Sequence, residues 1–320
     1  MDKYIVSPSP HVKAHTSTSN IMLDVIIALI PAIIAGAVIF GVRSLWVILV
    51  SVAGAVLSEH LWCVFTKKKT TVTDLSAVVT GVLLALTLPV NIPLYMPFLG
   101  SAFAIIIVKE LFGGLGNNFM NPALAGRAFL VASFSSEMTS FTKPFSVDAV
   151  TTVTPLRSLK AHEAVTATYK DLFFGNIGGC IGEVCAFALI IGFIYLLIRK
   201  IILPHAVFSY VIGVGVLGYI FGYEGWFTGD FLVSILTGGV LLGGIFMLTD
   251  YVTSPTTKTG NIVYGILAAL ITVFIRLKGG YPEGVCYSIL LANILAPQID
   301  KFFIPKKFGY VKKTREGQVK

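Results

Sequence analysis

Charged residues are scarce in this chain: only 12% of its 320 residues are Asp, Glu, Lys or Arg, whereas 55% are hydrophobic. A soluble globular domain carries roughly a quarter charged residues. The deficit excludes an ordinary water-soluble domain, because most of the surface cannot face water. A membrane span needs about 20 mostly apolar residues, so the length accommodates about ten spans joined by short loops.

Cysteine is also scarce, and the four residues are Cys63, Cys180, Cys185 and Cys286. No two of them form a Cys-x-x-Cys pair, so their spacing supports neither an iron–sulfur cluster nor a zinc site. A Gly-rich nucleotide-binding fingerprint is missing as well. We therefore expect no metal site in this chain, and we expect its cysteines to be packing residues.

The formal net charge of +8 does not indicate a nucleic-acid partner. Seven of the 24 basic residues lie in the last twenty positions, and Lys67, Lys68 and Lys69 form a short run. Basic and aromatic residues do not interleave, and no basic domain is evident. We interpret the basic residues as signals of orientation in a lipid bilayer.

Ten apolar runs predict transmembrane helices. They cover residues 21–41, 44–66, 75–90, 94–112, 119–134, 178–199, 202–221, 231–249, 262–277 and 282–297. The fifth and tenth runs contain Asn121-Pro122 and Asn293…Pro297, which predicts broken or tilted helices within a bundle. The expected fold is an all-α integral membrane protein of about ten transmembrane helices.

Basic residues are distributed unevenly between the loops. If the N-terminus is cytoplasmic, fifteen lie on the inner side and seven on the outer side, while Lys109 and Arg127 fall within spans. Because basic loops stay in the cytoplasm, we predict that both termini are cytoplasmic. The expected organisation is a cytoplasmic tail (1–20), a first five-helix half (21–134), an extracytoplasmic loop (135–177), a second five-helix half (178–297) and a basic cytoplasmic tail (298–320).

The two halves show a faint internal repeat. Thr80-Gly81-Val82-Leu83-Leu84 resembles Thr237-Gly238-Gly239-Val240-Leu241-Leu242, and Asp74 and Asp230 precede these segments. An offset of five helices would make the repeats inverted, an arrangement that frames a midplane site in many transporters. Such strings also arise by chance in apolar sequence, so both explanations stay open.

Polar residues inside predicted spans are the first candidates for function. Lys109 and Glu110 are adjacent, so we expect them on different faces of their helix. Arg127 ends the segment Asn121-Pro122-Ala123-Leu124-Ala125-Gly126-Arg127, beside the long loop. Its guanidinium suits a phosphate or carboxylate ligand; the alternatives are an interface anchor or a partner for an acidic residue.

The long loop contains Asp148-Ala149-Val150-Thr151-Thr152-Val153-Thr154-Pro155-Leu156. The spacing from Asp148 through Thr151 to Thr154 matches the acceptor pattern of proteins that carry FMN covalently on threonine. In those proteins a dedicated transferase esterifies the flavin phosphate to the hydroxyl. Val153 stands where Ala is usual, and Thr152 where Gly or Ser is usual. A simple Thr-rich turn is the alternative interpretation.

Covalent attachment at Thr154 would need an accessible hydroxyl, which we expect on an extracytoplasmic loop. A loop at a membrane surface is expected to enclose little volume for retaining a free cofactor. A covalent tether replaces binding energy with a fixed local concentration. We therefore predict Thr154 as the flavin-bearing residue, a phosphoryl threonine, with Asp148 and Thr151 as the rest of the motif.

The chain resembles the NqrB/RnfD family over almost its whole length. The similar segments are Ser7-Pro8-Ser9-Pro10-His11, Ile21-Met22-Leu23-Asp24-Val25-Ile26-Ile27-Ala28-Leu29-Ile30-Pro31-Ala32, Asn121-Pro122-Ala123-Leu124-Ala125-Gly126-Arg127-Ala128 and Met247-Leu248-Thr249-Asp250-Tyr251-Val252-Thr253-Ser254-Pro255. The short N-terminus favours RnfD over NqrB. The resemblance implies a ten-helix subunit of a bacterial or archaeal cytoplasmic membrane, with covalent FMN at Thr154 on the outer side. The similarity to NqrB adds a second, non-covalent riboflavin as an option.

The resemblance also implies a function in electron transport. The family's Rnf complexes pass electrons between ferredoxin and NAD and translocate Na⁺ or H⁺. The implied partners are RnfA, RnfB, RnfC, RnfE and RnfG, together with a flavin transferase. We expect the chain to relay electrons through FMN, with Arg127 and Asn121 in the flavin site, and to be inactive alone. A ten-helix secondary transporter or channel, or a membrane scaffold, is the alternative, and neither needs a flavin.

Overall fold

The structure, a computed structural model, describes residues 17–68, 70–145, 151–163, 167–223, 225–281 and 283–304. Within these ranges the chain is mostly helical, and its strands form two small two-stranded sheets. The predicted helical membrane class is confirmed to this extent. The predictions for Asp148, for most of the N-terminal tail and for most of the C-terminal tail lie outside the described residues.

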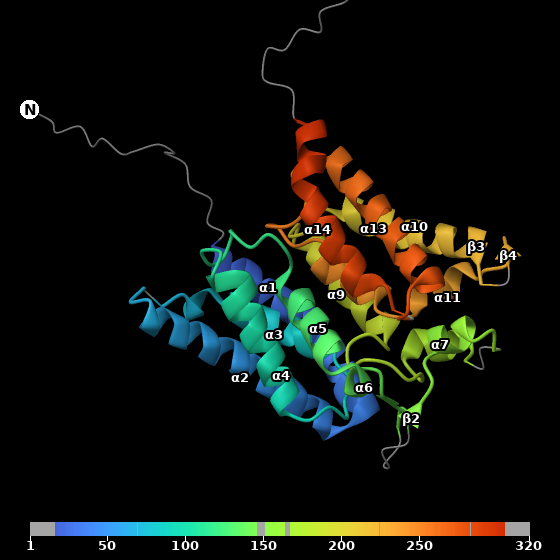
Figure 1. Cartoon of the computed structure of the whole chain (residues 1–320), viewed down its shortest axis with the longest axis horizontal. Coiled ribbons are helices and arrows are strands. Elements are labelled where there is room, and N and C mark those ends of the chain that lie inside the picture. The colour runs from blue at the N-terminus through green and yellow to red at the C-terminus, as the bar shows by residue number, and fades with distance from the viewer. Residues whose placement is uncertain are drawn as a thin grey trace, which may run out of the picture.

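The first half of the chain forms a group of packed helices, coloured blue to green in Figure 1. They are α1 (Thr18–Phe40), α2 (Val42–Phe65), the 3-10 turn η1 (Val72–Asp74), α3 (Ser76–Leu86), α4 (Tyr95–Phe103), the π-helix η2 (Ala104–Glu110) and α5 (Pro122–Ser133). Helix α3 contacts α1, α2 and α5 and is buried on nearly all sides. A helix that is apolar all round is stable only when it is enclosed in this way.

The second half forms another group, coloured yellow to red. It contains α9 (Ala186–Ile198), α10 (Pro204–Ile220), strands β3 (Phe221–Gly222) and β4 (Gly225–Trp226), α11 (Phe231–Leu236), α12 (Val240–Leu242), the π-helix η3 (Gly243–Met247), α13 (Lys258–Lys278) and α14 (Val285–Phe302). The strands β3 and β4 pair antiparallel, with Phe221 opposite Trp226.

The two groups share one hydrophobic core. Buried leucines of α1 and α9, Leu29 and Leu189, belong to the same cluster. The two helices approach closely at Gly192, where an added Cβ would lie 2.3 Å from the carbonyl oxygen of Ala28. Small residues permit such close packing of helices in a membrane protein.

Each of the ten predicted apolar runs contains a helix, but their lengths differ. Only α1, α2 and α13, among the described residues, are both long and apolar enough to cross a membrane. The run 231–249 is divided between α11, α12 and η3, because Gly238 and Gly239 adopt positive φ angles of 66° and 73°. Helix α14 continues through Pro297 to Phe302, so of the predicted break or tilt the break is not seen. Ten complete spans and two inverted repeats stay predictions.

The segment between the halves lies at one end of both groups, where Figure 1 labels α6, β2 and α7. Its elements are α6 (Ser135–Met138), β1 (Phe141–Thr142), β2 (Thr151–Thr152), α7 (Pro155–Lys160) and α8 (Tyr169–Phe174), and β1 pairs antiparallel with β2. The backbone N–H of Phe145 donates to the carbonyl of Ile39 at 3.0 Å, and Lys160 donates to the carbonyl of Gly279. The segments that the basic residues assign to the outer side therefore meet at this end.

Candidate functional site

Thr154 lies between β2 and α7, where it forms the N-cap of the helix. Pro155 takes the first helical position, for which its fixed φ is suited and its missing N–H is not needed. The hydroxyl oxygen of Thr154 accepts a hydrogen bond from the backbone N–H of Arg157 at 3.4 Å. The residue is only 5% exposed. The prediction of an accessible hydroxyl is therefore wrong for the folded chain, because α7 folds back onto the second half.

Helix α7 is held against that half by a few contacts. Leu156 is buried, and it packs against the turn at Gly238, where an added Cβ would lie 2.2 Å from Leu156 Cδ1. Lys160 Nζ donates to the carbonyl of Gly279 and, at 3.4 Å, to that of Tyr281. These contacts place Thr154 at the junction between the loop and the second half.

A cavity of about 580 Å³ adjoins Thr154. Its lining includes the cations Arg127, Arg157 and Lys160, the hydroxyls of Ser135, Ser136 and Thr139, and the aromatic rings of Phe141, Tyr281 and Tyr287. The rings of Tyr281 and Tyr287 stack with their centroids 6.2 Å apart and their planes at 28°. Cofactor sites usually enclose about 300–1,000 Å³ with apolar walls and a few polar groups. The expectation that this loop encloses little volume is wrong.

Sequence reasoning missed most of the residues that line this cavity. Arg157 and Lys160 enter the sequence analysis only as basic residues of the outer loop. Tyr281 and Tyr287 belong to no motif in the sequence. The lining comes from segments more than a hundred residues apart, α5 to α7 on one side and the start of α14 on the other. The basic residues beside the threonine motif were the one available signal.

Arg127 lines the same cavity and is bound by two carboxylates. Its Nη1 donates to Glu183 Oε1 at 2.6 Å, and its Nη2 donates to Glu283 Oε2 and, at 3.6 Å, to Cys180 Sγ. The structure thus gives Arg127 acidic partners, one of the roles considered for it. The pairs join α5 to loops of the second half, and the Arg127 side chain is 10% exposed.

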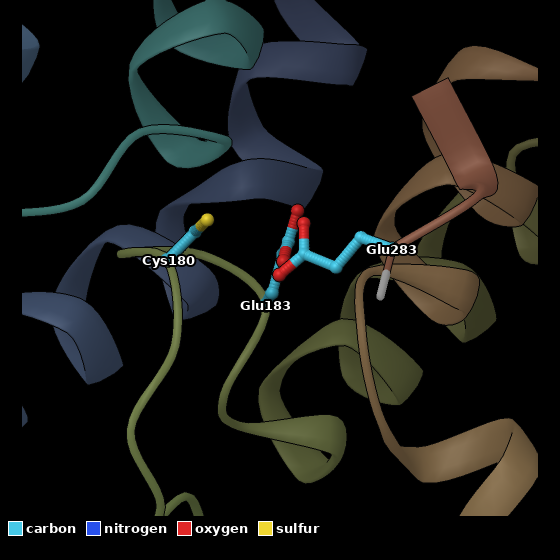
Figure 2. Close-up of side chains that lie close together, drawn as sticks. All are labelled: Cys180, Glu183 and Glu283. Atoms are coloured by element: carbon cyan, nitrogen blue, oxygen red, sulfur yellow. The ribbon is translucent and has the colours of Figure 1, made fainter. Parts of the chain in front are cut away.

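Arg127 has three side-chain partners, which converge from two loops. Figure 2 shows these partners: Cys180, Glu183 and Glu283. Their ligand-type atoms lie within 4.8 Å of one another, which is the kind of group that can hold a metal ion. The guanidinium of Arg127 contacts all three side chains and supplies a positive charge among them. We therefore interpret the cluster as an ion pair between the halves.

Asn121 lies away from this cavity. Its Oδ1 accepts hydrogen bonds from the backbone of Ala123 and Leu124 at 3.0 and 3.3 Å, which caps α5. Its Nδ2 donates to the carbonyl of Met247 at 3.2 Å. It lines a separate cavity of about 90 Å³, together with Lys109. The structure therefore does not bring Asn121 to Thr154.

The remaining motif residues are only partly described. Thr151 belongs to β2, and its backbone faces Thr142 across the sheet. Asp148 lies in the interval 146–150, outside the described residues. The structure thus describes the acceptor end of the motif and leaves the role of Asp148 as a prediction.

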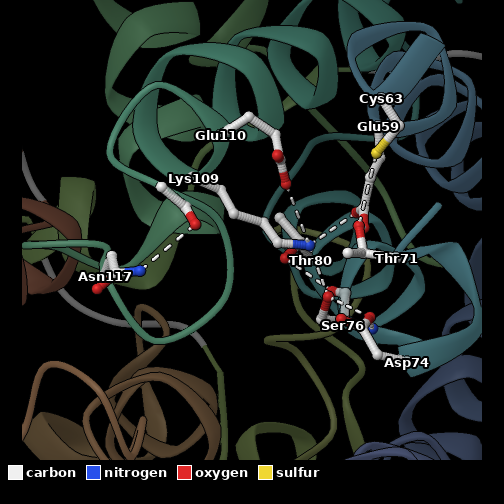
Figure 3. A network of polar contacts seen from close by, with 10 residues as sticks. Glu59, Cys63, Thr71, Asp74, Ser76, Thr80, Lys109, Glu110 and Asn117 are labelled. Atoms are coloured by element: carbon white, nitrogen blue, oxygen red, sulfur yellow. Dashed lines mark hydrogen bonds and ion pairs between the residues drawn. The ribbon is translucent and has the colours of Figure 1, made fainter. Parts of the chain in front are cut away.

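A second buried polar cluster lies in the first half, around Lys109 (Figure 3). Lys109 Nζ donates to Glu59 Oε2 at 2.7 Å and to Ser76 Oγ at 2.6 Å, and Thr71 donates to Glu59 Oε1 at 2.5 Å. Lys109 also lies 3.9 Å from Glu110 Oε1. The two residues are adjacent in the π-helix η2, and the ends of their long side chains approach each other, so their expected position on different faces does not keep the charges apart.

Comparison with known proteins identifies the family of the chain. The model of the NQR2, RnfD, RnfE family matches residues 5–309. The D subunit of the Na⁺-translocating ferredoxin:NAD⁺ oxidoreductase complex of Acetobacterium woodii is 46% identical over 316 residues, covering 98% of each chain. The D subunit of the proton-translocating ferredoxin:NAD⁺ oxidoreductase complex of Clostridium ljungdahlii is 44% identical over 318 residues, covering 96% of each.

A more distant relative extends the comparison. The D subunit of an ion-translocating oxidoreductase complex from an Escherichia coli strain is 33% identical over 351 residues, covering 96% of this chain and 99% of that one. The family match spans nearly the whole chain, and the relatives are similar in length. The chain therefore belongs to the NQR2, RnfD, RnfE family.

Proposed function

We propose that this chain is the D subunit of an ion-translocating ferredoxin:NAD⁺ oxidoreductase complex, in which it relays electrons through FMN esterified to Thr154. The complex is supported by two relatives that carry this activity in their names and match over nearly their full length. The flavin is supported by the threonine motif and by the cavity that adjoins Thr154. The cavity is the observation that carries the proposal, because it combines volume, cations and aromatic rings beside the acceptor.

The residues that line the cavity fit FMN. Arg157 and Lys160 provide cations for a phosphate ester at Thr154, since charge-assisted hydrogen bonds to phosphate are strong. Tyr281 and Tyr287 provide an aromatic wall for the isoalloxazine, because aromatic rings pack favourably in offset or tilted stacks. Bound there, FMN would supply the one- and two-electron transfer that no side chain of the chain provides.

The chain's own residues would hold the flavin and limit its contact with water. Helix α7 covers Thr154 from the side of the second half through Leu156 and Lys160. Arg127 faces the cavity, but its charge is shared with Glu183 and Glu283. We infer that the main role of Arg127 is to join the two halves. Its effect on a reduced, anionic flavin is small, because its charge is already balanced by the two carboxylates.

The partners and orientation extend the same proposal. We propose assembly with RnfA, RnfB, RnfC, RnfE and RnfG, maturation by a flavin transferase, and translocation of Na⁺ or H⁺ by the complex. We further propose a cytoplasmic membrane location with the Thr154 loop outside, supported by the distribution of basic residues. A second, non-covalent riboflavin stays a prediction.

The decisive experiment is to express the chain together with a flavin transferase and examine variants of the motif. We expect the wild-type chain to fluoresce in a denaturing gel and to gain the mass of FMN minus water. Thr154→Val should abolish both signals and leave membrane insertion intact, because it removes the only oxygen that the ester can use. Thr151→Val and Thr152→Val test the register of the motif, because either hydroxyl is the acceptor if the motif is misaligned. Thr152, which lies outside the Asp148, Thr151 and Thr154 pattern, is the matched control, and Thr152→Val should retain flavin.

Each other outcome corrects a particular part of the proposal. If Thr154→Val keeps its flavin and either Thr151→Val or Thr152→Val loses it, the acceptor is wrong and the electron-carrying function stands. If no variant acquires flavin in the presence of an active transferase, the flavin relay fails. A transporter or a scaffold for other redox subunits would then be the better assignment.

A further inference from the structure

We propose that FMN is attached to Thr154 while α7 is undocked, and that α7 closes onto the second half only afterwards. The flavin transferase would thus recognise an open form of this loop and not the folded subunit. The inference rests on the proposed function, because it takes Thr154 as the acceptor. It adds an order of events to that function: attachment first, docking second.

The burial of Thr154 is the first observation. The residue is 5% exposed, and its hydroxyl oxygen accepts a hydrogen bond from the backbone N–H of Arg157 as the N-cap of α7. A transferase must bring both a donor phosphorus and a base to that oxygen at the same time, within about 3–3.5 Å. The adjoining cavity of about 580 Å³ has the size of a site for one cofactor. It cannot admit the active site of a second protein as well.

The chemistry of attachment requires this access. The hydroxyl oxygen of Thr154 attacks the flavin-side phosphorus of a flavin dinucleotide, and a new O–P bond forms. The phosphoanhydride bond breaks, a nucleoside monophosphate leaves, and the hydroxyl proton passes to a base of the transferase. An activated donor of this class is needed because FMN alone has no comparable leaving group.

The contacts that hold α7 closed are few enough to open locally. The helix has six residues, of which only Pro155 and Leu156 are buried. It is docked by Leu156 against Gly238, by the partly buried Leu159 against a small cluster of five buried apolar residues, and by Lys160 on the carbonyls of Gly279 and Tyr281. The preceding strand β2 has two residues. Segments with so few buried apolar contacts open at low free-energy cost, without unfolding of the whole protein.

Attachment would itself favour the closed form. Arg157 and Lys160 line the same cavity as Thr154. A phosphate ester on Thr154 would introduce a negative charge into a cavity lined by these two cations and Arg127 as well as by the carboxylate of Glu283, and the isoalloxazine would fill apolar space beside Tyr281 and Tyr287. Both effects stabilise the docked position of α7, because they exist only when the cavity is assembled.

The test compares the rate of flavin attachment in proteins that differ in the docking of α7. The full chain is produced without a transferase, purified in detergent, and then given a flavin transferase with FAD. Leu156→Ala removes buried contacts of α7 and should accelerate attachment about tenfold or more, because truncation of a buried leucine increases the population of the open form. Lys160→Met should accelerate it less. Ser158→Ala, on the same helix, should match the wild type.

A second measurement guards against a variant that fails to fold. Hydrogen exchange of the α7 amides should be fast in the unmodified wild-type chain and slower after flavin attachment, and sub-denaturing urea should accelerate attachment to the wild type. If the folded wild-type chain accepts flavin at Thr154 as fast as Leu156→Ala and Lys160→Met, the inference is overturned and the proposed function survives. If no form accepts flavin, even when co-expressed with the transferase, the proposed function fails instead.

Discussion

Arg127 is a buried cation, and its contribution to stability depends on its two carboxylate partners. Arg127→Leu would leave Glu183 and Glu283 without a cation, and breaking such a buried pair costs about 3–5 kcal/mol of stability. Arg127→Lys should recover only part of this loss, because an ammonium cannot match the fork of a guanidinium. Thermal unfolding in detergent measures the stability, and in-gel fluorescence measures flavin content. Unchanged stability with lost flavin would instead assign Arg127 to the cofactor.

Lys109 and Glu59 form a second buried pair, and a double-mutant cycle can measure its strength. Both side chains are almost fully buried, at 3% and 0% exposure, and their charged atoms are 2.7 Å apart. Lys109→Met or Glu59→Gln alone should reduce the free energy of unfolding by about 3–5 kcal/mol, because each leaves an unpaired buried charge. The double variant should be more stable than the sum of the two losses predicts.

The exposed Lys68 provides the control for this cycle. Lys68→Met should change stability by less than about 0.5 kcal/mol, because surface substitutions away from such features have small effects. Additive losses in the double variant would show that Glu59 and Lys109 contribute independently. The hydrogen bond that Thr71 donates to Glu59 and the one that Ser76 accepts from Lys109 would then account for the network shown in Figure 3.

Helix α5 begins at a cap that also ties it to the second half. Asn121→Ser keeps a capping oxygen but is too short to reach the carbonyl of Met247, whereas Asn121→Ala loses both interactions. We expect Asn121→Ala to be less stable than Asn121→Ser by about 1 kcal/mol, the usual contribution of an N-cap. Flavin at Thr154 should be unchanged in both, because Asn121 lines a different cavity. Loss of flavin in a folded variant would restore Asn121 to the cofactor site.

The helix bundle has one end on each side of the membrane, and the distribution of basic residues predicts which end faces the cytoplasm. A cysteine introduced at Glu163, which is exposed in the segment between the halves, should react with a membrane-impermeant thiol reagent in intact cells. A cysteine at Ile304, after α14, should react only after lysis. The unmodified chain is the reference, because its native cysteines are buried or half-buried. The reverse labelling pattern would invert the predicted orientation.

Features that depend on residues close together in the sequence were predictable. The length of an apolar run is such a feature, so the positions of α1, α2 and α13 followed from the apolar runs. The division of the eighth run at Gly238 and Gly239 was not predicted, although two adjacent glycines signal a break. The approach of the Lys109 and Glu110 charges was not predicted, because it depends on how two long side chains lie in the packed chain.

The sequence by itself determined the class of protein, the family and the threonine motif, since each is recognised from runs or short segments of consecutive residues. Only the tertiary structure decided that Thr154 is buried, that Arg127 meets Glu183 and Glu283, and that a cavity adjoins the motif. Arg127 is separated from these partners by 56 and 156 positions. Contacts over such distances depend on how the two halves pack, and packing is a property of the whole chain that no local pattern of residues encodes.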